Sequence, residues 1–219
     1  MMLRVAIVAG LLGGAALLPG VSSAALLTSD PGTGTTTVFT DTGSQTLGAG
    51  PVSLDGFTVT GLPNIYAADQ DYGLNDNGNW DAFSQIATNN GDGSIIFDLG
   101  GNFGLVGAFM NYAIYQNDGF SDPTITALDA SMTVLETHDL LTDAPISTPG
   151  GDNDGAFRGF DIAGGNIRFL ELSGSYIIAH SIEVGDAGPV APDVPEPASL
   201  ALLGTALAGF GVARRNRKR

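Results

Sequence analysis

Short apolar segments separated by turn residues recur along the middle of the chain. In residues 57–60 apolar and polar positions alternate, and the same period of two is found in residues 181–184. This alternation is typical of half-buried antiparallel strands, because successive side chains point to opposite faces of a sheet. Gly, Pro, Asn or Asp bounds each segment. The pattern predicts strands at residues 35–40, 57–60, 94–99, 105–115, 124–128, 131–136, 157–162, 167–173 and 177–184.

Two gaps between these segments have the residues of tight turns. Asp129-Ala130 separates two short segments, and Gly164-Gly165-Asn166 precedes another. Such residues suit hairpin turns in which a positive φ is needed, so neighbouring strands should be antiparallel. No repeat of fixed period occurs, which argues against a propeller. We therefore expect an all-β fold in which two antiparallel sheets form a jelly-roll sandwich.

The composition agrees with one β-rich domain. The chain has 219 residues, of which 43% are hydrophobic and 14% are charged, and it contains 32 glycines. Tight turns are therefore plentiful, and long charged surface helices are disfavoured. Once the two terminal segments are set aside, the length suits a single domain, which we predict at residues 25–187.

The charge of this domain is strongly negative. Between residues 25 and 193 the only basic residues are Arg158 and Arg168, against 22 acidic residues, so the formal charge is −20. Such a surface repels nucleic acid and anionic lipid headgroups, and we expect no nucleic-acid partner. The chain has no cysteine, which excludes disulfides, thiolate metal sites and cysteine nucleophiles.

The N-terminal segment has the pattern of a secretory signal peptide. Arg4 gives a positive start, residues 5–18 are apolar or small, and Pro19-Gly20 would break a helix. The small side chains of Ser22 and Ala24 suit the pockets of signal peptidase. We therefore predict a signal peptide at residues 1–24. A buried N-terminal helix is the alternative.

The C-terminal segment has the pattern of a short membrane anchor. Residues 188–197 contain four prolines, which favour an extended chain, and we take 188–194 as a spacer. Residues 198–213 are apolar or small, and we predict a transmembrane helix there. This run is shorter than the roughly 20 residues that span a hydrocarbon core. The basic tail, residues 214–219, would hold the C-terminus in the cytoplasm; its charges are Arg214, Arg215, Arg217, Lys218 and Arg219.

Residues 195–219 resemble the PEP-CTERM sorting signal, because Pro195-Glu196-Pro197 precedes the apolar run and the basic tail. In that family the Pro-Glu-Pro element is read by an exosortase, a membrane-embedded transpeptidase of Gram-negative bacteria that make extracellular polysaccharide. The resemblance implies that signal peptidase and an exosortase process this chain. It also implies transient anchoring in the inner membrane, followed by the cell surface or extracellular matrix. A plain C-terminal anchor is the alternative.

Residues 93–184 also resemble a domain common in exported PEP-CTERM proteins. The resemblance lies in the strand that ends Phe97-Asp98-Leu99, the segment GLVGAFMNY, the hairpin TALDASMTVLET and the closing strand HSIEVGD. Those domains are similar to galactose-binding-like jelly rolls. The resemblance is a pattern of strands, and it implies a fold without assigning a site.

The densest polar stretch, residues 69–81, offers oxygen ligands at alternate positions. Carboxylate and amide oxygens suit Ca²⁺. The stretch is not an EF-hand, because Leu74 stands where that motif requires glycine. Asn, Asp and Gly are also the residues that loops use for backbone reasons, so an ordinary turn-rich loop is the alternative. The candidate Ca²⁺ ligands are Asp69, Asp71, Asn75, Asp76, Asn77 and Asp81.

A second acidic loop lies at residues 150–155, where Asp152 and Asp154 flank an asparagine. It suits either a cation or a simple turn.

Tyrosines and the single tryptophan are candidates for sugar binding, because an aromatic ring packs against the apolar C–H face of a pyranose. Trp80 and Tyr72, beside the acidic loop, are the candidate glycan contacts. Tyr66, Tyr112 and Tyr115 belong to the same group of candidates. The alternative is ordinary packing of aromatic side chains.

Catalysis has little support in the sequence. Only His138 and His180 could act as bases near neutral pH, and neither lies in a recognised catalytic motif. We therefore expect no enzyme. The sequence indicates an exported, non-enzymatic surface or matrix protein that associates with extracellular polysaccharide. The alternatives are a carbohydrate-binding module with a defined glycan site and a polysaccharide hydrolase, since 22 acids also allow a catalytic pair.

Overall fold

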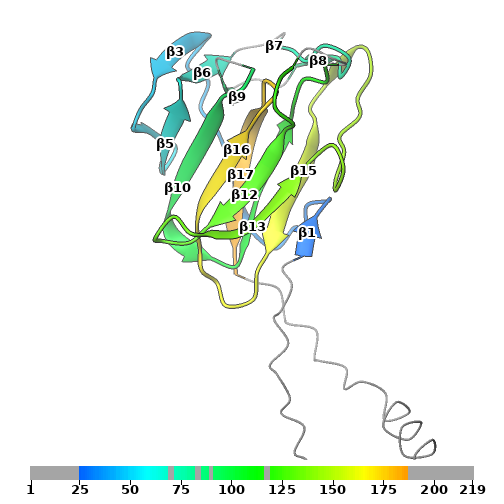
Figure 1. Ribbon diagram of the computed structural model, residues 1–219. Coiled ribbons are helices and arrows are strands. Elements are labelled where there is room, and N and C mark those ends of the chain that lie inside the picture. The colour runs from blue at the N-terminus through cyan, green and yellow to red at the C-terminus, as the bar shows by residue number, and fades with distance from the viewer. Residues whose placement is uncertain (1–24, 69–71, 82–84, 89–90, 116–118, 187–219) are drawn as a thin grey trace, which may run out of the picture.

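The prediction of an all-β fold is confirmed. The computed structural model describes residues 25–68, 72–81, 85–88, 91–115 and 119–186. Throughout these ranges the regular secondary structure consists of strands, arranged in two large antiparallel sheets and one small sheet (Figure 1). The large sheets pack as a sandwich; the finer assignment as a jelly roll stays a prediction.

Several predicted features lie outside the described residues. They are the signal peptide, the proline-rich spacer and the sorting signal with its apolar helix and basic tail. In the ranges that the structure covers, no helix is long and apolar enough to cross a membrane.

Sheet A has eight antiparallel strands. Their order is β1-β15-β11-β17-β9-β6-β3, and β2 also pairs with β17. The bounds are β1 (Ala25–Leu27), β2 (Thr35–Val38), β3 (Gln45–Gly48), β6 (Ile65–Ala68), β9 (Gln85–Thr88), β11 (Leu105–Asn111), β15 (Ala156–Asp161) and β17 (Ile178–Gly185).

Sheet B has six antiparallel strands in the order β13-β12-β16-β10-β5-β4. In Figure 1 strands β12 and β16 of this sheet cross in front of β17 of sheet A. The bounds are β4 (Val52–Leu54), β5 (Phe57–Leu62), β10 (Ser94–Phe103), β12 (Thr124–Leu128), β13 (Val134–Asp139) and β16 (Ile167–Ser173). A third, small sheet has the order β14-β8-β7, with β7 (Tyr72–Gly73), β8 (Asn79–Trp80) and β14 (Asp152–Asn153).

The main core lies between the two large sheets, where strands of both sheets bury apolar side chains. In β5 the buried Phe57 and Val59 alternate with the exposed Thr58 and Thr60, as the sequence pattern predicts. Phe97 of β10 is fully buried in this core and stacks on Phe39 with 5.7 Å between ring centroids. Burial of these side chains removes apolar surface from water and is the main stabilising term of the sandwich.

A second, smaller core lies on the other face of sheet A. It contains Trp80, Leu74 and Ile178, with Tyr66 and Tyr72 packed at its edge. Trp80 and Leu74 come from the segment that includes β7 and β8. The polar stretch that begins at residue 69 therefore covers one part of sheet A.

The predicted strand at residues 131–136 is wrong at its beginning. The strand starts at Val134 and continues to Asp139. Asp129 accepts hydrogen bonds through its side chain from the N–H groups of Ser131 and Thr133, and Met132 has a φ of 63°. These contacts make a turn of residues that the alternation alone assigns to a strand. The prediction also misses eight short strands of two to four residues each.

Both ends of the described domain lie at one end of the sandwich. Ala25 pairs with Asp161, Asp161 pairs with Leu105, and Leu105 pairs with Gly185, so these residues form one row across sheet A. At about 4.8 Å between strands, Ala25 and Gly185 are about 14 Å apart. Strands β7 and β8 lie at the opposite end of the molecule (Figure 1).

Candidate functional site

The two polar loops that the sequence offers as separate cation sites lie side by side. Strands β8 and β14 pair in parallel, with Asp152 opposite Asn79 and Asn153 opposite Trp80. The N–H of Asp81 also donates to the carbonyl oxygen of Asn153 at 3.1 Å. The structure therefore joins residues about 70 positions apart in one small sheet.

Asn77 is the centre of this junction. It is fully buried, and its side-chain oxygen accepts from the N–H of Thr148 at 2.6 Å. Its Nδ2 lies within hydrogen-bonding distance of Asn111 Oδ1 (2.7 Å), Tyr112 O (3.0 Å) and Ile146 O (3.2 Å). The amide is therefore engaged with protein groups and is shielded from solvent. In this structure the Asn77 side chain holds loops together, and its role as a Ca²⁺ ligand stays a prediction.

The other candidate Ca²⁺ ligands do not converge in the described part of the chain. Asn75, Asp76 and Asp81 are exposed, and Asn75 donates through Nδ2 to the carbonyl of Ile114 at 2.8 Å. Among the residues that the structure covers, no three His, Asp or Glu side chains form a metal-binding group. Asp69 and Asp71 lie outside these residues. The Ca²⁺ site stays a prediction.

Trp80 cannot contact a glycan from solvent. Its exposed fraction is 0%, and its ring lies 5.8 Å from the ring of His180 and packs in the smaller core. The predicted glycan contact at Trp80 is therefore wrong. A tryptophan that ends a polar stretch looks available in the sequence, but here the ring is the apolar anchor of that stretch.

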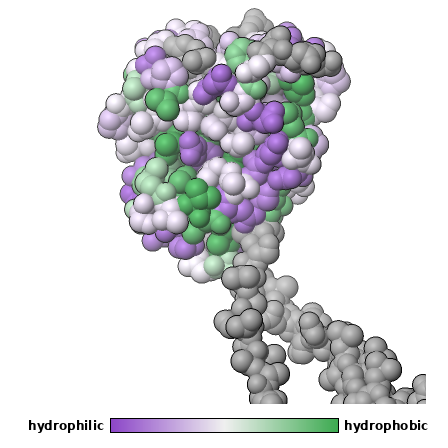
Figure 2. Space-filling view, viewed as in Figure 1, coloured by the Kyte–Doolittle hydropathy of each residue, from purple (hydrophilic) through white to green (hydrophobic). Residues whose placement is uncertain are grey.

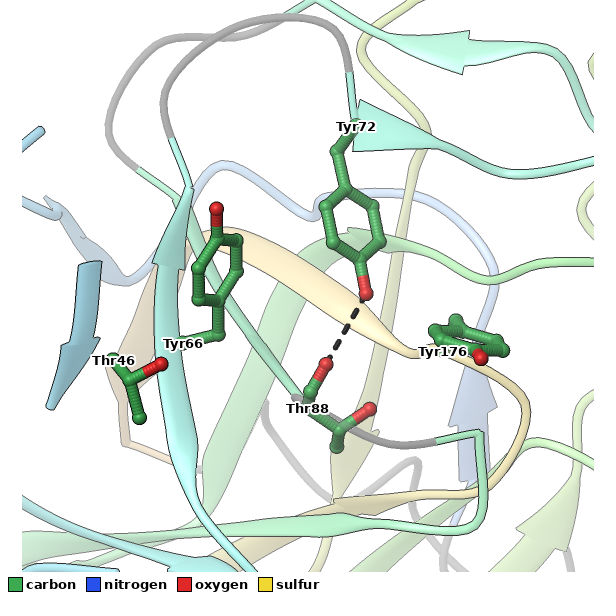
Figure 3. Close-up of a pocket in the computed structure, with 5 residues that line it drawn as sticks. All are labelled: Thr46, Tyr66, Tyr72, Thr88 and Tyr176. Atoms are coloured by element: carbon green, nitrogen blue, oxygen red, sulfur yellow. Dashed lines mark hydrogen bonds between the residues drawn. The ribbon is translucent and has the colours of Figure 1, made fainter. Parts of the chain in front are cut away.

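Tyr72 does line a cavity, which we call the tyrosine cavity. Its volume is about 230 Å³. Figure 3 shows three tyrosine rings around it, with the Tyr72 hydroxyl directed toward the backbone of Thr88. The lining residues come from β3, β6, β7, β9 and the turn before β17: Thr46, Tyr66, Tyr72, Thr88 and Tyr176.

Strand alternation positions one wall of the cavity. In β6, Ile65 and Ala67 are buried in the main core, so Tyr66 between them points away from sheet B. Tyr66 pairs with Thr46 on β3. These two residues therefore stand side by side on the outer face of sheet A.

A hydrogen bond positions the Tyr72 ring. The hydroxyl of Tyr72 donates to the carbonyl oxygen of Thr88 at 3.1 Å. Burial raises the pKa of Tyr72 above its ordinary value, and the nearby Tyr176 adds to that effect. The hydroxyl is therefore protonated across the physiological range and remains a donor.

Tyr176 reaches the cavity from a strained turn. Its φ is 49°, a left-handed conformation that costs a non-glycine residue about 1–2 kcal/mol. The turn is held by Ser175, whose Oγ donates to the carbonyl of Ala113 at 2.7 Å. The Tyr176 ring also contacts Tyr115 and Phe120, with centroids 5.7 and 5.4 Å away. Tertiary contacts thus keep this ring at the cavity despite the backbone strain at Tyr176.

The tyrosine cavity suits an uncharged, hydroxyl-rich ligand. The five lining side chains that the structure describes are three phenols and two threonines, which are polar groups without a permanent charge. Aromatic faces pack against C–H groups, and the hydroxyls can exchange hydrogen bonds with a sugar. Sequence reasoning named Tyr66 and Tyr72 but missed Tyr176, because nothing local marks a turn tyrosine as a wall of a cavity.

The two histidines lie in different surroundings. Both ring nitrogens of His138 contact carboxylates, those of Glu136 and Asp143. Partial burial lowers the pKa of His138, but these hydrogen bonds outweigh it, so the pKa lies above its ordinary value. Burial lowers the pKa of His180, which packs against Trp80 and Phe109. His138 is thus an ion-pair partner, and His180 is a half-buried neutral ring.

Comparison with known proteins concerns the C-terminal segment. Residues 193–218 match the family model described as the PEP-CTERM protein-sorting motif. No curated protein sequence and no solved structure matches this chain. The prediction of a sorting signal is therefore confirmed. The chain carries a PEP-CTERM protein-sorting motif, which supports an exported protein that is anchored in the membrane and processed by an exosortase.

Proposed function

We propose that this exported, exosortase-processed protein binds extracellular polysaccharide through the tyrosine cavity and catalyses no reaction on it. The observation that carries the proposal is a cavity whose described lining consists of three tyrosines and two threonines, placed away from the strand end that leads to the sorting motif. Among the functions that the sequence left as alternatives, this cavity favours a carbohydrate-binding module with a defined glycan site.

The position of the cavity agrees with a surface role. Tyr176 comes just before β17, and Gly185 ends it, so the strand connects the cavity to the end that leads to residues 193–218. At about 3.3 Å per residue, the length of β17 is roughly 25 Å. The cavity therefore lies near the start of β17, and the chain leaves the domain toward the sorting motif at the other end of this strand. After processing, the domain would present the cavity at the cell surface or in the extracellular matrix.

The size and composition of the cavity support binding of one sugar unit. Its volume of about 230 Å³ lies below the range of roughly 300–1,000 Å³ that holds drug-sized ligands. Among the residues that the structure describes, the lining includes no carboxylate and no imidazole. Glycoside hydrolysis uses a pair of carboxyl groups at the scissile bond, so this lining favours binding over cleavage.

Affinity electrophoresis tests the proposal. The full chain, in detergent, is run through gels that contain the extracellular polysaccharide of the producing bacterium. We expect the polysaccharide to retard the wild-type chain, and Tyr176→Ala and Tyr72→Ala to weaken this retardation at least about tenfold. Val38→Ala is the control, because Val38 is exposed on β2 and lies outside the cavity lining. Equal retardation of all four proteins, with unchanged melting curves, would refute the proposal.

A further inference from the structure

The outer face of sheet B carries a second site-like arrangement. Strand alternation directs Thr58, Asp98 and Phe169 to this face. Asp98 pairs with Thr58 on one side and with Phe169 on the other, so the three residues form one row across β5, β10 and β16. In the next row Ile96 pairs with Thr60.

These residues form a groove, which we call the sheet-B groove. Its volume is about 290 Å³, and Met132 from the β12–β13 turn completes its lining. Met132 is 46% exposed. Figure 2 shows hydrophobic surface enclosed by hydrophilic surface on the side of the molecule where Figure 1 shows sheet B. The groove thus combines an apolar floor with polar neighbours. Its lining residues are Thr58, Thr60, Ile96, Asp98, Met132 and Phe169.

The polar groups of the groove are held in place. Arg168 Nη2 lies 2.7 Å from Asp98 Oδ1, and the N–H of Gly100 donates to the same oxygen at 3.0 Å. Partial burial raises the pKa of Asp98, but these two contacts outweigh it and hold the pKa below its usual value. The guanidinium carbon of Arg168 also lies 5.8 Å from the centroid of the Phe169 ring. An aromatic ring therefore stands beside a fixed acceptor and a fixed donor.

This chemistry fits an uncharged sugar better than an anionic one. Arg168 is paired with Asp98, and Arg158 is only 6% exposed and donates to the carbonyls of Ala144 and Pro145. These are the only two Lys or Arg residues between residues 25 and 193, so no unpaired guanidinium or ammonium group of the domain meets an anionic polymer. The charge of −20 over that span repels such a polymer as well.

The tyrosine cavity and the sheet-B groove lie on opposite faces of the sandwich. Tyr66 points away from sheet B, while Phe169 lies on the face of sheet B that points away from sheet A. The main core, about 10 Å thick, separates the two sheets. A polysaccharide chain bound at one site therefore leaves the other site accessible.

We propose that the domain is bivalent: the sheet-B groove binds a second, uncharged polysaccharide chain, so that one protein molecule cross-links two chains. This inference rests on the proposed function for the tyrosine cavity and adds a site of its own. The protein is then a cross-linker of the extracellular matrix rather than only a ligand of it. The gain over a single site comes from avidity. Once one site holds the polymer network, the effective concentration of polysaccharide at the other site rises.

The test uses the full chain reconstituted at one copy per lipid nanodisc, which prevents cross-linking through the membrane mimic. The probe is the uncharged fraction of the extracellular polysaccharide of the producing bacterium. Binding is measured by co-sedimentation and cross-linking by low-shear viscosity. Phe169→Ala and Asp98→Asn alter the groove, and the nearly isosteric Asp98→Asn preserves packing. Val134→Ala is the matched control, because Val134 is 54% exposed on sheet B outside the groove lining.

We expect the wild type and Val134→Ala to raise the viscosity. Phe169→Ala and Asp98→Asn should still co-sediment, with about tenfold weaker binding, but the rise in viscosity should be lost. Tyr176→Ala should behave in the same way, and the double variant Phe169→Ala/Tyr176→Ala should not bind.

Two outcomes overturn the inference alone. If Phe169→Ala and Asp98→Asn cross-link as the wild type does, the groove is not a second site and binding at the cavity still stands. If sedimentation without polysaccharide shows a dimer that Phe169→Ala abolishes, the groove binds a second copy of this chain. A third outcome, in which Tyr176→Ala leaves binding and viscosity unchanged, overturns the proposed function of the cavity.

Discussion

The tyrosine cavity and the sheet-B groove offer similar chemistry but are built in different ways. The cavity takes its five residues from positions 46 to 176, on four strands and a turn. The groove takes five of its six residues from three adjacent strands of one sheet, and Met132 from a turn. One site thus depends on how distant segments meet, and the other depends on the pleat of a single sheet.

This difference in construction predicts a difference in robustness. The cavity relies on the hydrogen bond from Tyr72 to Thr88 and on the β7–β8 segment, which Asn77 joins to distant loops. The groove relies on the backbone ladder of sheet B and on the main core beneath it, to which Phe97 belongs. Changes in buried polar groups should therefore affect the cavity more than the groove. Four changes, from the largest expected effect to the smallest, test this view.

Asn77→Ala should give the largest effect. It removes a fully buried amide and leaves Thr148 N–H and Ile146 O without that partner. Because unsatisfied buried groups are costly, the free energy of unfolding should fall by about 3–5 kcal/mol in urea titrations. Polysaccharide binding at the cavity should weaken more than binding at the groove. The exposed Asn102→Ala is the control and should stay within about 0.5 kcal/mol; an equal effect of the two variants would contradict the structural role of Asn77.

Tyr72→Phe should have a moderate effect that is confined to the cavity. It removes the hydrogen bond to the Thr88 carbonyl but keeps the ring. We expect a loss of about 1 kcal/mol in unfolding free energy and weaker polysaccharide binding, because the ring is less well held. Tyr66→Phe is the matched control in the same cavity and does not touch that bond. Isothermal titration and urea unfolding measure both quantities, and identical results for the two variants would show that the bond has no role.

The two histidines should respond to pH in opposite directions. The pKa of His138 is raised by Asp143 and Glu136, so these ion pairs stabilise the fold fully below about pH 6.5, and this contribution is lost as the pH rises through the raised pKa. The pKa of His180 is lowered by burial, so its neutral ring favours the fold above about pH 6.5, and stability is lost as the pH falls through the lowered pKa.

NMR titration of the two imidazoles measures these shifts directly. His138→Gln should lower Tm by about 1–3 °C at about pH 6 and by less at about pH 9, since a partly exposed ion pair contributes little. A titration in which both rings share one midpoint near 6.5 would show that neither environment acts on its histidine.

Met132→Gly should give the smallest effect. Met132 has a φ of 63°, which glycine adopts without strain, so unfolding free energy should rise by about 0.5 kcal/mol despite the greater freedom of the unfolded chain. The groove loses one wall, so binding there should weaken while binding at the cavity stays constant. Ala130→Gly, in the same turn, is the control and should not stabilise the protein. Differential scanning calorimetry distinguishes the two variants.

The sequence predicted the strands that contribute most to the main core. Period-two alternation located β5 because its apolar residues face the core and its polar residues face outward. It also located β17, although the polar Ser181 and Glu183 of this strand are buried. It placed the start of β13 too early, because hydrogen bonds to the Asp129 side chain make a turn of residues that fit a strand pattern. Strands of two residues, such as β7, carry too few positions to show any period.

The candidate sites were only partly predictable. Alternation within β10 places Ile96 and Asp98 on one face, but only the strand pairing of the structure brings Thr58 and Phe169 beside Asp98. Tyr72, predicted as a glycan contact, lines a cavity, whereas Trp80, predicted as another glycan contact, and Asn77, predicted as a Ca²⁺ ligand, are buried. A stretch rich in Asn and Asp looks exposed, but its amides can be satisfied inside the protein by segments that are distant in the chain.

What the sequence determined by itself about this protein is local: its sorting motif, its longer strands and its negative charge all depend on neighbouring residues or on composition. Only the tertiary structure decided which distant residues meet. It joined the loops around Asn77 and Asn153, turned Trp80 into a core residue, and placed Tyr176 beside Tyr72. The physical reason is that buried polar groups need partners and apolar rings need cover, and both are supplied by segments whose spacing along the chain carries no signal.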